Sequence, residues 1–314
     1  MRRATHLVAH ADWSAGPKKR WLAAAVLRAD GRYELAPTKR IGPLEDLWRA
    51  LERMDGERVL LGFDFPLGLP AAYAGHAGID DFVAVLPHFG EGRWQRFYDV
   101  ASEPGEIGLE RPFYPARPGG RRRRELLDGL GLAEWSDVLR RCDRRSATRT
   151  AACALFWTLG GSQVGKAAIA GWRDLLAPAL RAGLDVALWP FQGPLDELLA
   201  RHRFVVAETY PGEVYGHLGL VLHRHGGKRS QSARCANVAS LLTQMRRLGV
   251  EAEPAARAEI EDGFGSRGSG EDRFDAVVGL LGMLNVVLGR RPSGEPDDPI
   301  VRRIEGWILG QTAE

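Results

Sequence analysis

Five acidic residues stand where short apolar runs end or where a long apolar helix begins. They are Asp12, Asp64, Glu208, Asp272 and Asp275. The last two are three residues apart, so both can face the same side of a helix. Carboxylates that are held close together repel one another unless a cation neutralises them. If the fold brings these acids together, they therefore predict a cation site.

Magnesium suits such a set of oxygen ligands, because proteins bind it through a few carboxylates together with water and substrate phosphate. Two such ions can activate a water molecule and stabilise the leaving oxygen of a phosphodiester. We therefore expect a Mg²⁺ (or Mn²⁺) site with all five acids as candidate ligands. The candidate catalytic residues among them are Asp12, Asp64, Glu208 and Asp275. Simpler roles stay open for each acid taken alone, since acids in the first turn of a helix also stabilise its end.

The elements that must position these acids begin with three short apolar runs separated by Gly-Pro and Asp-Gly turn signals. The runs are residues 5–12, 20–28 and 32–37. They predict an antiparallel meander of three strands. Helical spacing of apolar residues then predicts a helix at 43–54, and RVLLGFDF at 58–65 predicts a buried strand.

Regular patterns return after residue 200 with a core-like strand and two helices. These lie at 203–208, 230–248 and 271–288. We expect a single domain with its core at about 1–70 and 200–314 and a large insertion or subdomain at about 71–200. Within the insertion, weaker patterns predict helices near 133–141 and 167–182 and a strand at 185–189. Because parallel strands open onto one edge at their carboxyl ends, this order would bring the acids together.

The composition is that of a globular chain of 314 residues, with a net charge of +3 and 45% apolar residues. No stretch approaches about eighteen consecutive apolar residues, so we expect no membrane-spanning helix. The three cysteines are few, far apart and odd in number, which argues against a disulfide framework or a cysteine zinc site. This pattern predicts a protein of the reducing cytoplasm.

Arginine clusters point to nucleic acid as a possible partner. One run covers 121–124, and a second set is Arg140, Arg141, Arg144, Arg145 and Arg149. Such clusters can bind phosphate, or they can form a solvated face with internal ion pairs. The candidate substrate-binding residues are Arg141, Arg144, Arg145 and Lys228. The sequence leaves the oligomeric state open.

Five segments carry a family resemblance: HADWSAGPKKRWLAAAV, GFDFPLGLP, RRCDRRSATR, VVAETYPGEVYGHLG and EDRFDAVVGLLGML. In this order they resemble the uncharacterised family of predicted RNase H-like nucleases. The helix with Asp272 and Asp275 followed by Ala276 also resembles the Asp-x-x-Asp-Ala helix of Holliday-junction resolvases. The resemblance implies an α/β fold with an RNase H-like mixed sheet, and a metal site that uses Asp12, Asp64, Glu208 and Asp275.

The leading hypothesis is therefore a Mg²⁺-dependent nuclease, and two others stay open. Actin-like ATPases and sugar kinases share the architecture and hold phosphate in a hairpin after the first strand, but no repeat of the three-strand unit is found after residue 203. A protein that binds nucleic acid without cutting it is the third. His10, two residues before Asp12, is either a proton carrier or a histidine hydrogen-bonded inside the sheet.

Overall fold

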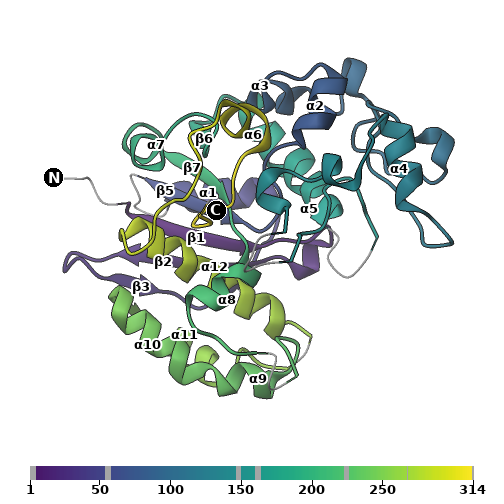
Figure 1. Cartoon of the computed structure of the whole chain (residues 1–314). Helices are drawn as coiled ribbons and strands as arrows, with labels where there is room; N and C mark the ends of the chain where they lie inside the picture. The colour runs from purple at the N-terminus through teal and green to yellow at the C-terminus, as the bar shows by residue number, and fades with distance from the viewer. Residues whose placement is uncertain are drawn as a thin grey trace.

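An eight-stranded mixed sheet runs through the middle of the protein (Figure 1). The computed structural model describes residues 5–53, 58–145, 150–159, 164–222, 226–266 and 268–312. Within these ranges the strand order is β6-β7-β5-β1-β2-β3-β8, and the short β4 also pairs with β2. The strands are β1 (Leu7–Asp12), β2 (Trp21–Leu27), β3 (Tyr33–Leu35), β4 (Lys39–Arg40), β5 (Val59–Phe63), β6 (Val186–Leu188), β7 (Phe204–Glu208) and β8 (Val250–Ala252).

The two halves of the sheet differ in strand direction. Strands β1, β2 and β3 form the predicted antiparallel meander, whereas β5, β7 and β6 extend the sheet in parallel with β1. Short turns suffice between antiparallel neighbours, but a parallel strand needs a crossover, and α1 (Leu44–Arg53) provides it before β5. The arrangement confirms the predicted α/β class and mixed sheet, and it is consistent with an RNase H-like fold.

Helices cover both faces of this sheet. They are α2 (Ala71–Ala77), α3 (Phe82–Val85), α4 (Arg123–Leu130), α5 (Val164–Gly171), α6 (Ala177–Arg181), α7 (Leu195–Arg201), α8 (Pro211–His217), α9 (Gln231–Ala236), α10 (Val238–Leu248), α11 (Pro254–Glu261) and α12 (Gly270–Val287), in addition to α1. Apolar side chains of α1 and α5 join the cluster on one face, and those of α8, α10 and α12 join the cluster on the other. In Figure 1, α12 lies across β1 and β2.

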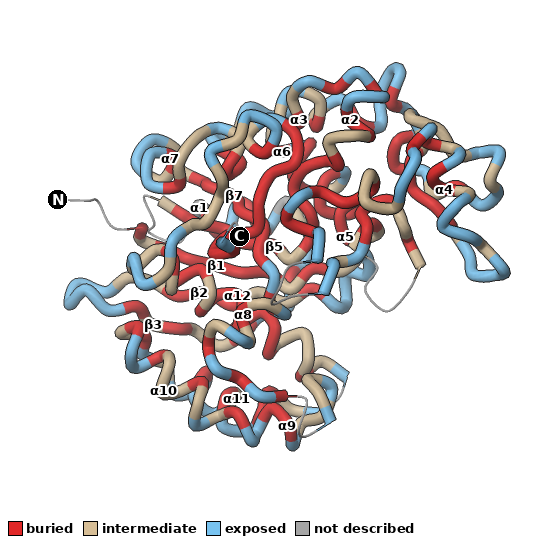
Figure 2. The backbone as a smooth tube through the Cα atoms, in the orientation of Figure 1, coloured by how far each residue is buried: buried red, intermediate tan, exposed pale blue. Residues whose placement is uncertain are grey.

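The alternation of side chains along each strand decides which face a residue reaches. Phe204 and Val206 of β7 pack into the α1 face, while Val205 and Ala207 pack into the α12 face. Because both faces are covered, the central strands are apolar almost throughout, and Figure 2 shows them as buried backbone. Because of this two-residue period, a shift of one position along a strand moves a side chain to the other face of the sheet.

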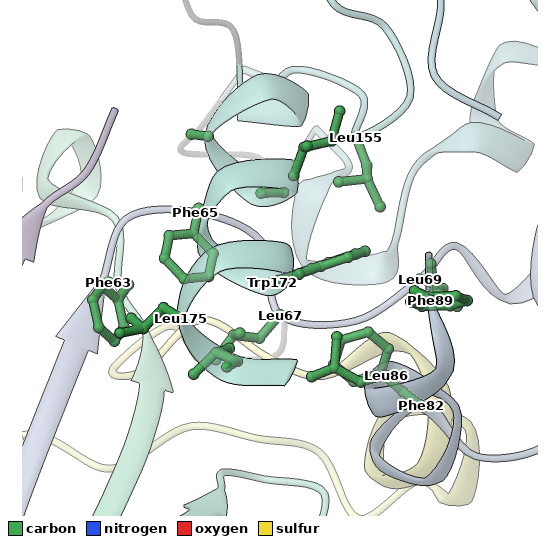
Figure 3. Packing of buried hydrophobic residues seen from close by; sticks show 14 of the residues in the cluster. Phe63, Phe65, Leu67, Leu69, Phe82, Leu86, Phe89, Leu155, Trp172 and Leu175 are labelled. Atoms are coloured by element: carbon green, nitrogen blue, oxygen red, sulfur yellow. The ribbon is translucent and has the colours of Figure 1, made fainter. Parts of the chain in front are cut away.

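The insertion between β5 and β6 packs on the α1 face. Its centre is Trp172, which follows α5 and is buried among Phe82, Phe89 and the chain that leaves β5 (Figure 3). The Trp172 indole N–H donates to the carbonyl oxygen of Pro66 at 2.9 Å. Gly171 lets this helix come close, since a Cβ there would lie 2.3 Å from the Phe65 ring. The insertion is thus fixed to the strand end that carries Asp64.

Several elements differ from the sequence predictions. The helix predicted at 230–248 is two helices, because the side chain of Asn237 donates to the carbonyl oxygens of Ala233 and Val221 and accepts from the amide of Val221. The described stretch near 133–141 holds no α-helix but the short 3₁₀ turn Trp135–Val138 and the start of a second, Arg141–Asp143. Strand β6 joins the central sheet although it lies within the range assigned to the insertion.

None of the described helices is both long enough and apolar enough to cross a lipid bilayer. All three cysteines are free thiols, with Cys142 buried and the other two exposed. Cys142 belongs to the apolar cluster on the α12 face, where it packs as a small apolar side chain.

Candidate functional site

Three carboxylates come together at the carboxyl ends of the central strands. Asp12 is the last residue of β1, and Asp64 directly follows β5, the parallel neighbour of β1. Ala11 is paired with Phe63, so Asp12 and Asp64 occupy the next position on the two strands. Both follow by two residues a position that faces α12, namely His10 and Gly62, so both acids point toward the helix that carries Asp275.

Two glycines let α12 approach the sheet closely enough to bring Asp275 to this place. A Cβ at Gly279 would lie 2.3 Å from the ring of His10, and a Cβ at Gly62 would lie 2.4 Å from the sulfur of Met283. Gly279 is one helical turn after Asp275, and the two residues share a face of α12. The contact of Gly279 with β1 therefore sets Asp275 beside the end of that strand.

His10 joins α12 to the sheet through both of its ring nitrogens, and its imidazole stays neutral. It is fully buried, with Nδ1 at 3.1 Å from the carbonyl oxygen of Ala276 and Nε2 at 2.6 Å from the hydroxyl of Thr209. A carbonyl oxygen only accepts, so Nδ1 carries the proton and Nε2 accepts from Thr209. Burial lowers the pKa of His10 to about 3. The alternative of a histidine hydrogen-bonded inside the sheet is the one that these contacts support.

The acids raise one another's pKa values. Burial and then the charges of Asp64, Asp275 and Asp272 raise the pKa of Asp12 well above its ordinary value. Burial raises the pKa of Asp64 to about 7, although the backbone amide of Trp13 donates to its Oδ1 at 2.7 Å. Burial also raises the pKa of Asp275, against the opposing effect of Lys228. Burial is thus the first cause of all three shifts, and neighbouring carboxylates add to it.

Lys228 contacts two acids of α12, Asp275 and Glu271. Its Nζ lies 2.5 Å from Asp275 Oδ2 and 3.2 Å from Glu271 Oε1. The hydroxyl of Tyr215 donates to the other oxygen of Asp275. The buried guanidinium of Arg234 donates to the carbonyl oxygen of Lys228 and so fixes the backbone of the lysine. Sequence reasoning missed Tyr215, Glu271 and Arg234, because their roles depend on contacts between α8, α9 and α12 that no local spacing reveals.

Asp272 stands at the edge of the site. It is half-buried, and burial raises its pKa, with further contributions from Glu271 and Asp275. It also lies near enough to Asp12 for its charge to raise the pKa of that carboxyl. Four of the five predicted acids therefore gather in one region.

Glu208 does not join the other four, which corrects the sequence expectation. It continues the alternation of Phe204 and Val206 on β7 and therefore points to the α1 face. There both of its oxygens accept from the buried guanidinium of Arg140, at 2.6 and 2.7 Å, and one also accepts from the amide of Leu67. The position of this strand end that faces α12 is the next one, Thr209, which contacts His10.

The arginines predicted to bind substrate are exposed, and Arg141 is paired with acids. Arg141 contacts Asp298 at 2.6 Å and Glu305 at 3.7 Å. Arg144 and Arg145 are exposed on the same segment, and Arg149 lies outside the described residues. In the earlier run, Arg121 pairs with Glu103 and Arg124 with Asp128. Internal ion pairs thus account for a good part of these clusters.

The donor set suits a hard divalent cation, because Asp12, Asp64 and Asp275 supply only oxygen atoms. Among the residues that the structure describes, no group of three or more His, Cys, Asp or Glu side chains stands ready to hold a metal ion. Lys228 and Tyr215 instead engage both oxygens of Asp275. A metal would therefore need Asp275 to exchange the Lys228 ammonium for the ion.

No family model, curated protein or solved structure matches this chain.

Proposed function

We propose that this protein is a metal-dependent nuclease that hydrolyses phosphodiester bonds with Mg²⁺ or Mn²⁺. The ligands in this proposal are Asp12, Asp64 and Asp275, with Asp272 at the edge. One observation carries it: carboxylates from β1, from the end of β5 and from α12 face one another at the edge of the sheet where ligands bind in open α/β folds. Glu208 is not part of the proposed ligand set.

The charge balance supports a cation at this place. Asp12, Asp64 and Asp275 carry up to three negative charges, and Lys228 supplies one positive charge that contacts Asp275 and acts on Asp12 and Asp64 from a greater distance. Uncompensated charges of one sign are costly when they are partly removed from water, and either protonation or a bound cation relieves the cost. The raised pKa values represent the first of these outcomes, and a divalent cation would provide the second.

The roles of the residues follow from their contacts. A bound divalent cation would lower the pKa of a ligated water and offset charge on the phosphate. Asp12 and Asp64 would hold it from two strands whose positions the sheet fixes. Tyr215 would keep Asp275 oriented. Lys228, whose side chain is 40% exposed, would turn from Asp275 toward the phosphate of the substrate.

The test is cleavage of single-stranded and duplex DNA and RNA with Mg²⁺, Mn²⁺ or a chelator. We expect wild-type protein to cut at least one substrate only when metal is present. Asp12→Asn and Asp275→Asn should lower the rate at least a hundredfold, while the exposed control Asp80→Asn should cut like wild type. Cleavage by Asp12→Asn at the wild-type rate would falsify the proposal, provided that circular dichroism shows all variants folded.

The proposed setting of this activity is the cytoplasm. Three free thiols, one of them buried in the apolar core, suit a reducing compartment. Fractionation of the source cells, followed by detection of the protein, would check this part of the proposal. Recovery in an oxidising compartment would contradict it.

A further inference from the structure

A basic cleft lies beside the carboxylates, and the proposed function does not use it. Its volume is about 750 Å³, and its walls come from the loop after β1, from the start of α1 and from the insertion. Four cations line it, Lys18, Arg20, Arg40 and Arg173, against the single anion Asp174. The excess of three positive charges in a concave site favours a ligand with several negative charges.

Three of the four cations in the cleft lack the acidic partner that many arginines of this chain have among the described residues. Lys18 and Arg40 are exposed and form no ion pair with any described residue. Arg20 donates to the carbonyl oxygens of Ser14 and Ala15 rather than to an acid. Only Arg173 is paired, with the neighbouring Asp174 at 2.6 Å. Charge on Lys18 and Arg40 thus stays available to a ligand.

Two indoles hold the guanidinium groups in place. The guanidinium of Arg20 lies 4.2 Å from the centre of the Trp13 ring, and that of Arg40 lies 5.3 Å from the centre of the Trp21 ring. Stacking of this kind limits the rotamers of a long side chain, so less entropy is lost when the group binds an anion. The cleft is therefore partly organised before a ligand arrives.

The position of the cleft ties it to the carboxylates. Ala15 in its wall is three residues after Asp12, a stretch of chain that spans at most about 11 Å. Trp21 of β2 pairs with Asp12 across the sheet and with Arg40 of β4, so all three lie at one edge. The walls of the cleft from α1 and the insertion lie on the α1 face, whereas Asp12 points to the α12 face, so a ligand that reaches both must pass over the carboxyl end of β1. A polymer with regularly spaced phosphates could do so, whereas a lone phosphate could not.

We infer that this cleft holds the sugar-phosphate backbone of a nucleic-acid strand, with Lys18 and Arg40 contacting phosphates within a few nucleotides of the scissile bond. The inference rests on the proposed function for the meaning of the neighbouring carboxylates, but strand binding itself requires neither metal nor cleavage. It assigns substrate binding to the loop after β1 and to β4, and not to the arginine-rich segment near Arg141.

The experiment measures binding of fluorescent 20-nucleotide strands and duplexes by anisotropy, with chelator present and Asp12→Asn as the parent. The test variant adds Lys18→Glu and Arg40→Glu. The matched control adds Arg246→Glu and Arg247→Glu, an equal change of charge on exposed residues in the last turn of α10. This turn precedes Val250 of β8, which pairs with Tyr33, and Tyr33 pairs with Leu27 at the end of β2 away from the cleft. A milder pair, Lys18→Gln and Arg40→Gln, serves if charge reversal disturbs folding.

We expect the test variant to bind at least tenfold more weakly than the parent. The slope of its salt dependence should fall by about 1.4 with single strands and about 1.8 with duplex DNA, since each lost phosphate contact contributes about 0.7 or 0.9. The control should stay within twofold of the parent. Equal binding by parent and test variant, or equal loss in test and control, overturns the inference. Full displacement of the strand by a nucleoside monophosphate at matched ionic strength also overturns it, because the cleft would then be a mononucleotide site.

The two proposals fail in different ways. If the strand binds as expected but wild-type protein cuts nothing with metal, the nuclease proposal fails and the binding surface stands. If wild-type protein cuts, and a variant with Lys18→Glu and Arg40→Glu in the wild-type background cuts with the same KM, the inference about the cleft fails and the nuclease proposal stands.

Discussion

Individual residues show how far sequence alone could define the site. Asp12 and Asp64 follow apolar runs and Asp275 stands near the start of an apolar helix, and these positions predict all three; the structure gathers them on the α12 face. Glu208 looked equivalent, because it also closes a core strand. However, Glu208 lies one position away from the residue of β7 that would face α12. Because side chains alternate along a strand, that one position places it on the α1 face. Register between β5 and β7 decides this, and register is set by long-range pairing that the sequence does not display.

The raised pKa of Asp64 predicts a pH-dependent stability in metal-free protein. Its pKa in the folded state is about 7, against about 3.9 in an unfolded chain. Stability from protonated Asp64 is therefore fully present below about pH 4 and is lost as the pH rises through 7. Between pH 4.5 and 8, wild-type protein should lose on the order of 2 kcal/mol more unfolding free energy than Asp64→Asn.

Urea denaturation at both pH values in chelator measures this difference. The exposed control Asp80→Asn should follow wild type. If Asp64→Asn loses as much stability as wild type over this range, the carboxyl of Asp64 is not held in its protonated form, and the charge crowding at the site has been overstated.

At the scale of helices and strands, the sequence predicts whether an element is a helix or a strand better than it predicts where the element begins and ends. The meander, α1, β5, β7 and α12 all follow from apolar periodicity, since these elements bury one or both faces. The break at Asn237 could not be predicted from periodicity, because apolar spacing continues across it and the break coincides with contacts of the Asn237 side chain with Ala233 and Val221. Strand β8 is three residues long, too short for a periodic pattern, and it is defined by its pairing with β3.

The approach of α12 to the sheet gives a prediction at this scale. Gly279→Ala places a Cβ against the buried ring of His10, and we expect it to destabilise the protein by about 1–3 kcal/mol. It should also weaken Mn²⁺ binding, because Asp275 lies one turn away on the helix that must move. Urea denaturation and isothermal titration calorimetry measure the two effects.

Gly75→Ala in α2 is the matched control, since a Cβ there meets nothing within 4 Å. It should leave stability unchanged or raise it by up to about 1 kcal/mol, because alanine favours the helix. Wild-type stability and wild-type Mn²⁺ affinity in Gly279→Ala would show that the contact with His10 does not position Asp275.

At the scale of the whole molecule, buried charges join the insertion to the core. Arg140 from the insertion is fully buried and contacts Asp143, Glu208 of β7 and the carbonyl oxygen of Leu67. Glu305 near the end of the chain accepts from the amides of Ala71 and Arg141. These contacts make the insertion part of one structure with the sheet. The sheet also argues against the kinase alternative, because the described chain after β7 adds only β8 and no second three-stranded unit.

Glu208 therefore has a structural role that mutation can separate from metal binding. Glu208→Ala leaves the buried Arg140 with one fewer carboxylate, and we expect a loss of about 3–5 kcal/mol in unfolding free energy. Glu197→Ala removes an exposed ion pair with Arg201 and should cost less than about 1 kcal/mol. Glu208→Gln, which keeps the side-chain shape, should bind Mn²⁺ as tightly as wild type. Loss of Mn²⁺ binding without loss of stability would return Glu208 to the ligand set.

The most direct measurement of the central claim is a crystal structure of the protein soaked in Mn²⁺, with anomalous scattering used to locate the ion. We predict a peak within about 2–2.5 Å of carboxylate oxygens of Asp12, Asp64 and Asp275, with Lys228 displaced from Asp275. The opposite result would be an occupied Mn²⁺ site elsewhere, or none at all, with the contact between Lys228 and Asp275 intact at saturating Mn²⁺.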